Sequence, residues 1–218
     1  MQIGLVGAGM IGQALAVRFA GAGHEVMISN SRGPETIERL ARSIPGHVES
    51  GTVADAARFA KVVAVAIPTD AIRTLPAEAL AGRTVIDVNN YYPSPGRRLP
   101  ALDTGKTTSS ELLSSLLPGA SVVKAFNTIY FRRLLDDSRP DLPLGQRLAV
   151  PVAGDDPGAK RAVIGLVDEI GFTGVDAGTL ADSARQQPGS RLYLAYAESR
   201  RRGTTLNPAQ LRDLLAAG

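Results

Sequence analysis

Three glycines near the start of the chain, Gly7, Gly9 and Gly12, have the spacing G-x-G-x-x-G. In this motif the first glycine forms a tight turn, the second lets the backbone approach a diphosphate, and the third lets a helix pack closely on a strand. The apolar run 2–6 precedes the glycines, and apolar residues recur at helical period after them, so the motif lies between the strand and the helix that it needs. We therefore predict a dinucleotide site, with an ordinary tight turn as the alternative. The residues expected to contact the diphosphate are Gly7, Ala8, Gly9, Met10, Ile11 and Gly12.

A second polar cluster, Asn30-Ser31-Arg32, follows the apolar run 25–29. The end of the second strand is where such a unit contacts the adenosine ribose, and an NAD-binding unit places a carboxylate there, about 20 residues beyond the glycines. This cluster has no carboxylate; Ser31 offers a hydroxyl donor, and Arg32 offers a planar cation suited to phosphate oxygens. The cluster therefore predicts NADP(H) rather than NAD(H), with a simple polar turn as the alternative.

The chain offers few side chains for acid–base, covalent or metal chemistry. It has no cysteine, and its two histidines, His24 and His47, are expected in loops, so neither a metal site nor a thiol nucleophile is predicted. Reduction of a carbonyl needs a placed acid, whereas hydride transfer between two ring systems spreads charge over the acceptor. Lys124, Tyr91 and Tyr92 are the available acids, but an ion pair is favoured for the lysine, and stacking or packing for the tyrosines. We therefore predict no catalytic residue and hydride transfer by positioning alone.

Apolar strands alternate with amphipathic helices along the chain, which predicts an α/β fold with a doubly wound parallel sheet, the Rossmann fold. Strands are expected at 2–6, 25–29, near Val48, and at 61–67, 83–88, 121–125, 148–152 and 173–176. Helices are expected after the glycines, at 34–42, 52–60 and 71–80, from Ser109 or Ser110 to Leu117, and at 159–170.

One domain with a small appendage is predicted: 1–178 forms the NADP-binding Rossmann domain with extra C-terminal strands, and 179–218 forms the helical appendage. The appendage would cover the mouth of the site, pack on its own domain or contact a dimer partner. Within it, Tyr193 and Tyr196 are interpreted as core residues rather than cofactor contacts.

Ligands of such a sheet lie beyond the carboxyl ends of its strands. Besides the two clusters above, those ends carry Ile67-Pro68, Asn89-Asn90 and the segment Asn127-Thr128-Ile129-Tyr130-Phe131. We expect all of them to converge on one rim of the sheet. The Pro-, Gly- and Arg-rich stretch 94–106 is predicted to be a long loop with a functional role.

Several motifs follow one another along the chain: the glycine motif, Ser31-Arg32, the run Val122–Ile129, the run Val152–Pro157 with 165–178 after it, and Asp176–Leu180. Together they resemble the coenzyme F420-dependent NADP oxidoreductase family over essentially the whole chain. The resemblance implies a small dimeric Rossmann enzyme that moves a hydride between NADP(H) and the deazaflavin coenzyme F420. It implies that Gly7 to Gly12 hold the pyrophosphate and that Ser31 and Arg32 hold the 2′-phosphate. It places Ile67, Pro68, Asn90 and Phe131 near the nicotinamide, and Asn127, Thr128 and Ile129 where the two rings stack.

The second substrate stays open at this point. The resemblance extends to the cytosolic domains of membrane ferric reductases, in which NADPH passes its hydride to a flavin. An NADPH-dependent flavin, ferric or imine reductase would share every phosphate-binding residue and differ only around 89–92 and 127–131. A redox sensor that binds NADP(H) without turnover is the alternative that is not an enzyme.

Composition narrows the class of protein further. With 218 residues, 44% hydrophobic, and a net charge of +3, the chain has the composition of a soluble globular protein. It has no apolar run near about 18 residues and no signal-peptide pattern, so neither membrane association nor export is predicted, and a cytoplasmic location is expected. Lys and Arg form no long block, so nucleic acid is not an expected partner. Most of the arginines in the clusters Arg97-Arg98, Arg132-Arg133 and Arg200–Arg202 are interpreted as solvated faces, with phosphate binding as the alternative. The expected partners are a small-molecule redox substrate and a second copy of the chain.

Overall fold

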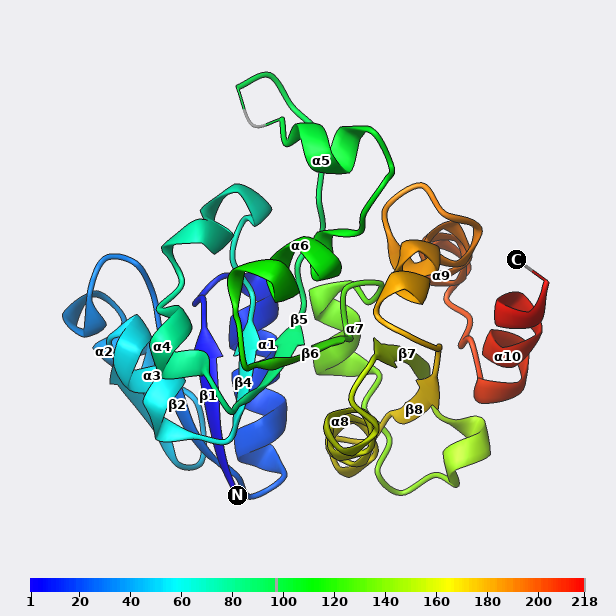
Figure 1. Ribbon diagram of the computed structural model, residues 1–218. Helices are drawn as coiled ribbons and strands as arrows, with labels where there is room; N and C mark the ends of the chain where they lie inside the picture. The colour runs from blue at the N-terminus through cyan, green and yellow to red at the C-terminus, as the bar shows by residue number, and fades with distance from the viewer. Residues whose placement is uncertain (97, 218) are drawn as a thin grey trace.

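The computed structural model describes residues 1–96 and 98–217, so Arg97 of the first arginine pair and the last residue lie outside the described residues. Within these residues one sheet of eight strands runs through the molecule in the order β3-β2-β1-β4-β5-β6-β7-β8 (Figure 1). The strands are β1 (Gln2–Val6), β2 (Glu25–Ser29), β3 (Val48–Gly51), β4 (Val62–Val65), β5 (Thr84–Asp87), β6 (Ser121–Lys124), β7 (Ala149–Gly154) and β8 (Thr173–Asp176). The order of the first six is that of a dinucleotide-binding Rossmann fold, which confirms the predicted fold class.

Helices cover both faces of the sheet. The α-helices are α1 (Met10–Gly21), α2 (Glu38–Ser43), α3 (Val53–Phe59), α4 (Ala77–Leu80), α5 (Pro100–Asp103), α6 (Ser109–Leu116), α7 (Phe131–Asp136), α8 (Pro157–Glu169), α9 (Arg191–Arg202) and α10 (Pro208–Ala216). The 3₁₀ helices are η1 (Pro34–Thr36), η2 (Thr69–Thr74), η3 (Leu144–Gln146) and η4 (Ala181–Gln186). Helix α5 lies within the stretch 94–106 that was predicted to be a loop, and the helix stands out from the rest of the molecule (Figure 1).

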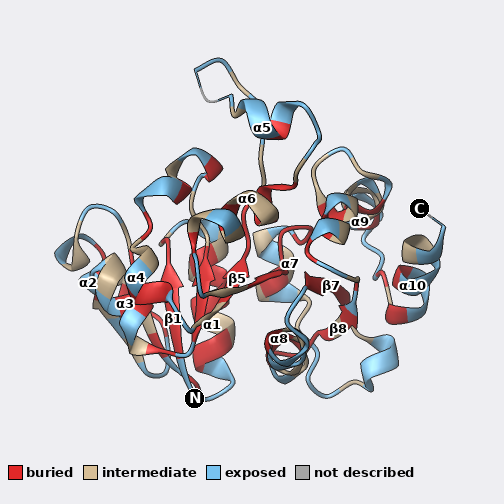
Figure 2. Ribbon diagram, in the orientation of Figure 1, coloured by how far each residue is buried: buried red, intermediate tan, exposed pale blue. Residues whose placement is uncertain are grey.

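Buried apolar residues form a core on each side of the sheet, and the strands themselves are almost wholly buried (Figure 2). One core lies between the sheet and helices α1, α7 and α8 and contains Phe19, Phe126 and Phe172. The other lies between the sheet and helices α3, α4 and α6 and contains Leu80 and Leu113. Burial on both faces explains why the strands are nearly continuous apolar runs in the sequence.

The sheet is mostly, but not wholly, parallel. Strand β7 pairs antiparallel with β6, through Val123 with Gly154 and Lys124 with Ala153, and β8 then pairs parallel with β7. The sequence predicted a parallel sheet throughout, because an apolar run that is buried on both faces looks the same in either direction. The reversal brings the start of β7 to the rim at which β6 ends.

Two helices that the sequence predicted as continuous are each divided. The stretch 34–42 forms η1 and α2, which meet at Ile37. The stretch 71–80 forms η2 and α4, because Pro76 forces the preceding Leu75 into an extended conformation with ψ 140°. Helix α6 is capped by Thr108, in a capping box with Glu111, rather than by Ser109 or Ser110.

The C-terminal helices α9 and α10 lie at the end of the sheet formed by β7 and β8 (Figure 1). The Tyr196 hydroxyl donates a hydrogen bond of 2.7 Å to the carbonyl oxygen of Ala149, which fixes α9 to the start of β7. Tyr196 is buried, as predicted for a core residue. Of the helices in the described part of the chain, none combines the length and the apolar character that a membrane crossing requires.

Candidate functional site

The turn between β1 and α1 requires glycine at two of its three motif positions. A Cβ on Gly7, whose φ is 114°, would lie 2.1 Å from the carbonyl oxygen of Ala66. A Cβ on Gly12 would lie 1.9 Å from the carbonyl oxygen of Gly7. Such distances exclude any side chain at either position. These two glycines therefore set the shape of the turn and the packing of α1 on the sheet.

Gly9 has a different role, because a Cβ there would have no protein atom within 4 Å. Its φ of −74° and ψ of −178° are also open to other residues. Gly9 is the N-cap of α1, and no side chain caps this helix end. The first N–H groups of the helix thus face open space with the positive end of the helix dipole behind them, which is the arrangement that binds a diphosphate.

The segments that follow the strands meet along one rim, as the sequence predicted. The strand ladder continues there through Gly7 N–H to Ser29 O (2.9 Å), Ala66 N–H to Val6 O (2.8 Å), Val88 N–H to Val65 O (3.1 Å) and Ala125 N–H to Asp87 O (3.2 Å). These bonds place the glycine turn and the segments after β2, β4, β5 and β6 side by side.

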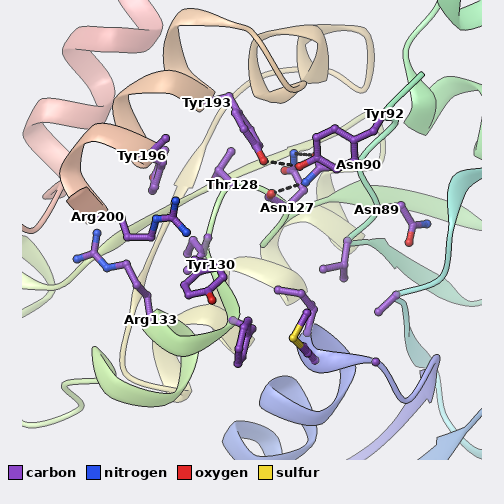
Figure 3. A pocket seen from close by; sticks show the side chains of 18 of the residues that line it. Asn89, Asn90, Tyr92, Asn127, Thr128, Tyr130, Arg133, Tyr193, Tyr196 and Arg200 are labelled. Atoms are coloured by element: carbon purple, nitrogen blue, oxygen red, sulfur yellow. Dashed lines mark hydrogen bonds between the residues drawn. The ribbon is translucent and has the colours of Figure 1, made fainter. Parts of the chain in front are cut away.

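A cavity of about 510 Å³ opens at this rim (Figure 3). The predicted site residues that line it are Gly9, Met10, Ile11, Ile67, Asn89, Asn90, Asn127, Thr128, Ile129 and Phe131. The predicted residues that do not line it are Gly7, Ala8, Gly12, Asn30, Ser31, Arg32 and Pro68. The cavity therefore lies in front of the first turn of α1, and the Asn30-Ser31-Arg32 cluster lies outside it, beside the glycine turn.

That outer cluster is a structured loop. The Asn30 side-chain oxygen accepts a hydrogen bond of 3.0 Å from the Arg32 backbone N–H, and its amide donates one of 2.8 Å to the Thr36 hydroxyl. Ser31 and Arg32 are exposed, and among the described residues the Arg32 guanidinium has no hydrogen-bond or ion-pair partner. Asn30 is thus occupied in shaping the loop, while Ser31 and Arg32 are free to bind an anion.

Three asparagines connect the loops behind the cavity. The Asn89 side-chain oxygen accepts a hydrogen bond of 2.8 Å from Ile67 N–H. The Asn90 amide donates to the Asn127 carbonyl oxygen (2.8 Å), and the Asn127 amide donates to the Asn90 side-chain oxygen (3.0 Å) and to the Gln186 carbonyl oxygen (2.7 Å). The loops after β4, β5 and β6 and helix η4 therefore form one cross-linked wall.

Phe126 strengthens this wall at some cost in backbone energy. It is the non-glycine residue with a positive φ, 64°, in the described part of the chain, and its ring is fully buried 6.4 Å from that of Phe19. A left-handed conformation of this kind costs on the order of 1–3 kcal/mol and persists where the surrounding packing enforces it. The turn directs Asn127 to Ile129 along the rim.

A buried ion pair supports the same wall from behind. Lys124 Nζ lies 3.0 Å from Asp87 Oδ2 and also donates to the carbonyl oxygen of Asn89, while the Ser110 hydroxyl donates to Asp87 at 2.6 Å. Both charged side chains are 1% exposed and neither lines the cavity. The predicted ion pair of Lys124 is confirmed, and the lysine acts on the site by holding Asn89.

The outer wall of the cavity comes from α7 and α9. Tyr193, interpreted from the sequence as a core residue, is only partly buried and lines the cavity, so that interpretation was wrong. Arg200 is exposed, as interpreted, and it lines the cavity as well. The Tyr193 hydroxyl lies 2.5 Å from the Tyr92 hydroxyl, and the Arg200 guanidinium stacks 4.6 Å from the ring centre of Tyr130 (Figure 3). Arg133, on α7, lines the cavity as well and is largely buried.

A signal for this wall was present in the sequence. The residues of α9 that line the cavity, Tyr193, Tyr196, Ala197 and Arg200, are spaced by three, four and seven positions and so lie on one helix face. Burial raises the pKa of Tyr196, and burial together with the Tyr193 hydroxyl raises the pKa of Tyr92, so both phenols stay neutral at physiological pH. The wall thus presents neutral rings and two guanidinium groups.

Comparison with known proteins supports a nucleotide-dependent oxidoreductase lineage. A family model described as "NADP oxidoreductase coenzyme F420-dependent" matches residues 2–91. The structure of the hypothetical protein SMa0349 from Sinorhizobium meliloti is 36% identical, with a TM-score of 0.76, over 87% of this chain and 91% of that one. A protein from Arthrobacter sp. FB24, described as a candidate F420-dependent NADP-reductase, is 26% identical, with a TM-score of 0.72, over 94% of this chain and 96% of that one.

One relative with a named activity is also similar. Metalloreductase STEAP3 from Rattus norvegicus is 33% identical over 187 residues, which are 85% of this chain and 35% of the rat protein. The chain thus spans about a third of the length of this relative.

Proposed function

We propose that the chain, whose residues 2–91 match the model of the coenzyme F420-dependent NADP oxidoreductase family, transfers a hydride between NADP(H) and a flat ring acceptor, in the first place the deazaflavin of coenzyme F420. The observation that carries the proposal is the make-up of the cavity wall. Among the described residues that line it, aromatic, aliphatic and amide side chains predominate, and none is Asp, Glu, His, Lys or Cys. A wall of this kind suits two stacked rings better than it suits acid–base catalysis.

The residues at the rim fit NADP(H). The uncapped first turn of α1 offers N–H donors, and the missing side chain of Gly9 leaves the space in which a diphosphate would reach them. Ser31 and the unpaired guanidinium of Arg32 would hold the 2′-phosphate on the loop that Asn30 shapes. Ile67, Asn90 and Phe131 would flank the nicotinamide.

When bound, NADPH supplies a hydride, which is one proton with two electrons, and the reduced acceptor takes up one further proton from water. The protein contributes position. The asparagine network fixes the loops after β4, β5 and β6 relative to one another, and the apolar side chains of Ile129 and Phe131 exclude water from the face on which the rings meet. The Tyr196 hydroxyl donates a hydrogen bond to the carbonyl oxygen of Ala149 and takes no part in the reaction.

A flavin or ferric reductase is the second candidate, because STEAP3, at 33% identity, is named a metalloreductase. It would use the same nucleotide-binding residues and differ in the acceptor. An imine reductase would also need a proton donor, and two of the phenols that line the cavity, Tyr92 and Tyr193, are hydrogen-bonded to each other. A redox sensor would bind NADP(H) and consume none.

The test is a titration of the purified protein with NADPH and NADH, followed by assays of NADPH oxidation with F420, FMN, FAD, ferric chelates and a cyclic imine. We expect tighter binding of NADPH than of NADH, and turnover with F420. Turnover only with a flavin or a ferric chelate would select the second candidate. Tight NADPH binding without turnover of any acceptor would contradict the enzymatic proposal in favour of the sensor.

A further inference from the structure

A second cavity, of about 390 Å³, adjoins the first and is strongly basic. It is lined by four arginines, Arg133, Arg139, Arg147 and Arg200, and by one carboxylate, Asp137. Its other lining residues are neutral. We call it the arginine cavity. Arg133 and Arg200 line both cavities, so the two share a wall (Figure 3 shows these arginines at one side of the first cavity).

The positive charge of the arginine cavity is largely uncompensated. Arg133 forms an ion pair with Asp137 and also donates to the Ser199 hydroxyl and the Thr204 carbonyl oxygen. Among the described residues, the other three arginines form no ion pair. Four guanidinium groups and one carboxylate leave a net charge of about three positive charges in a small volume, which favours an anion.

Each of the three unpaired guanidinium groups is held in place by neutral groups. Arg147 donates to the carbonyl oxygens of Leu142, Pro140 and Asp168. Its charge is also felt by the Asp168 carboxylate, whose pKa is nevertheless raised because the group is partly buried. Arg139 donates through one nitrogen to the carbonyl oxygens of Asp136 and Ser138, which leaves its other donors free. The Arg200 guanidinium lies over the ring of Tyr130, has no hydrogen bond or ion pair among the described residues, and lines both cavities, so its donors are available to an anion.

The arginine cavity is distinct from the Arg32 loop, to which the 2′-phosphate of NADP(H) is assigned above. The Arg32 loop follows β2, whereas the arginine cavity lies beside β7, and five strand spacings separate the two in the sheet order. At about 4.8 Å per spacing, the two sites are on the order of 24 Å apart. The diphosphate position at Gly9 borders the first cavity only.

We infer that the second substrate carries an anionic side chain, of phosphate or carboxylate groups, and that this chain lies in the arginine cavity while the ring lies in the first cavity. The inference rests on the proposed function and names its substrate class: a flat redox ring with an acidic tail, not a bare ring or a metal chelate alone. Arg200, between the cavities, binds the first anionic group after the ring, and Arg139 binds farther along the tail. Phosphate and carboxylate both match the planar guanidinium fork.

The test compares acceptors that share a ring and differ in the tail. F420 is compared with its deazaflavin chromophore lacking the phosphate and carboxylate chain, and FMN with riboflavin. The measured quantity is the ratio of kcat/KM with the tail to kcat/KM without it, in the wild-type protein and in Arg139→Gln. Arg201→Gln is the matched control, since Arg201 is exposed on the same helix as Arg200, is paired with Glu198 and lines neither cavity.

We expect the ratio for F420 to fall at least tenfold in Arg139→Gln, mainly through KM, and to stay unchanged in Arg201→Gln. A parallel fall of the FMN ratio identifies a single phosphate as sufficient, and a fall for F420 alone identifies the longer carboxylate tail; both support the inference. A ratio unchanged in Arg139→Gln, or lowered equally in Arg201→Gln, overturns it. Binding constants for the same pairs, from flavin and deazaflavin fluorescence in the presence of NADP⁺, give the ratio even for a protein that turns over no acceptor. Failure of the proposed function is therefore distinguishable from failure of this inference.

Discussion

Replacing Gly9 by alanine should weaken nucleotide binding and leave the fold almost unchanged. The structure separates the two effects, because a Cβ at Gly9 would contact no protein atom within 4 Å and would point into the space before the first turn of α1. Gly9 already has a backbone conformation that alanine adopts, with φ −74°. The substitution therefore fills only the volume assigned to the diphosphate.

The expected stability of Gly9→Ala follows from two small opposing terms. Alanine reduces the entropy of the unfolded chain, which stabilises by about 0.4–1 kcal/mol. It is a poorer N-cap than glycine, which costs about 0.5–1.5 kcal/mol. The net change lies within about 1 kcal/mol, so the Tm should move by no more than about 2–4 °C for a chain of this size. Gly12→Ala is the contrast: its Cβ would lie 1.9 Å from the Gly7 carbonyl oxygen, and the overpacking should lower the Tm by about 2–12 °C.

Binding should respond in the opposite order. The methyl group of Gly9→Ala would hold phosphate oxygens beyond the N···O distance of about 2.7–3.2 Å that a hydrogen bond needs. Loss of one charge-assisted hydrogen bond costs about 1.5–3 kcal/mol, which is at least tenfold in Kd. NADPH and NADH share the diphosphate, so both should weaken equally in a fluorescence titration. A wild-type Kd for NADPH in a folded Gly9→Ala protein would refute the placement of the diphosphate at this helix end.

Three further predictions concern single residues. Arg32→Ala should weaken NADPH binding by about 1.5–3 kcal/mol and leave NADH binding unchanged, whereas the control Arg39→Ala, which removes an exposed arginine of α2, should leave the binding of both nucleotides unchanged. An equal loss for NADPH and NADH in Arg32→Ala would contradict the 2′-phosphate assignment. Lys124→Met should lower the free energy of unfolding in urea by about 3–5 kcal/mol, because it leaves a buried carboxylate unpaired, and a loss below about 1 kcal/mol would argue against that ion pair. Burial and the nearby amino terminus lower the pKa of His24, against the opposing effect of Glu169, so His24 contributes stability above its ordinary pKa of about 6.5 that is lost as the pH falls toward its lowered folded-state pKa. His24→Asn should therefore flatten the dependence of unfolding free energy on pH in that range; an unchanged slope would rule out His24 as its source.

The sheet could be predicted because its signal is local. Each parallel strand is a short apolar run with a polar stop, and the strand at 173–176 and the one at 25–29 have the predicted bounds. An apolar run does not show in which direction its strand lies in the sheet. The sequence therefore did not predict that β7 is antiparallel to β6. Helix interruptions depend on single residues: Pro76 is visible in the sequence, but the apolar stripe on either side of it favours a continuous helix, and the extended backbone at Leu75 is seen only in the structure.

The candidate site likewise has one part that the sequence predicted and one part that it did not. Its nucleotide side lies within a continuous strand, turn and helix, so the spacing of Gly7, Gly9 and Gly12 was enough to find it. The opposite wall comes from residues far apart in the sequence, such as Tyr92 and Tyr193, whose hydroxyls lie 2.5 Å apart. Helical spacing alone did not distinguish a tyrosine facing a core from one facing a cavity.

This division bears on which part of the chain specifies the acceptor. The family model matches residues 2–91, which contain the glycine turn, the Arg32 loop and the first two asparagines of the network. Asn127, Arg139 and Arg200 lie beyond that range, in the segments that form the acceptor wall and the arginine cavity. We therefore expect a change of acceptor within such a fold to lie around 89–92 and in the segments after β6, because the glycine turn and the Arg32 loop bind a nucleotide that every acceptor would share. Substitutions at Arg139 should accordingly alter the choice of acceptor at constant NADPH affinity, whereas substitutions at Arg32 should alter NADPH affinity equally for all acceptors.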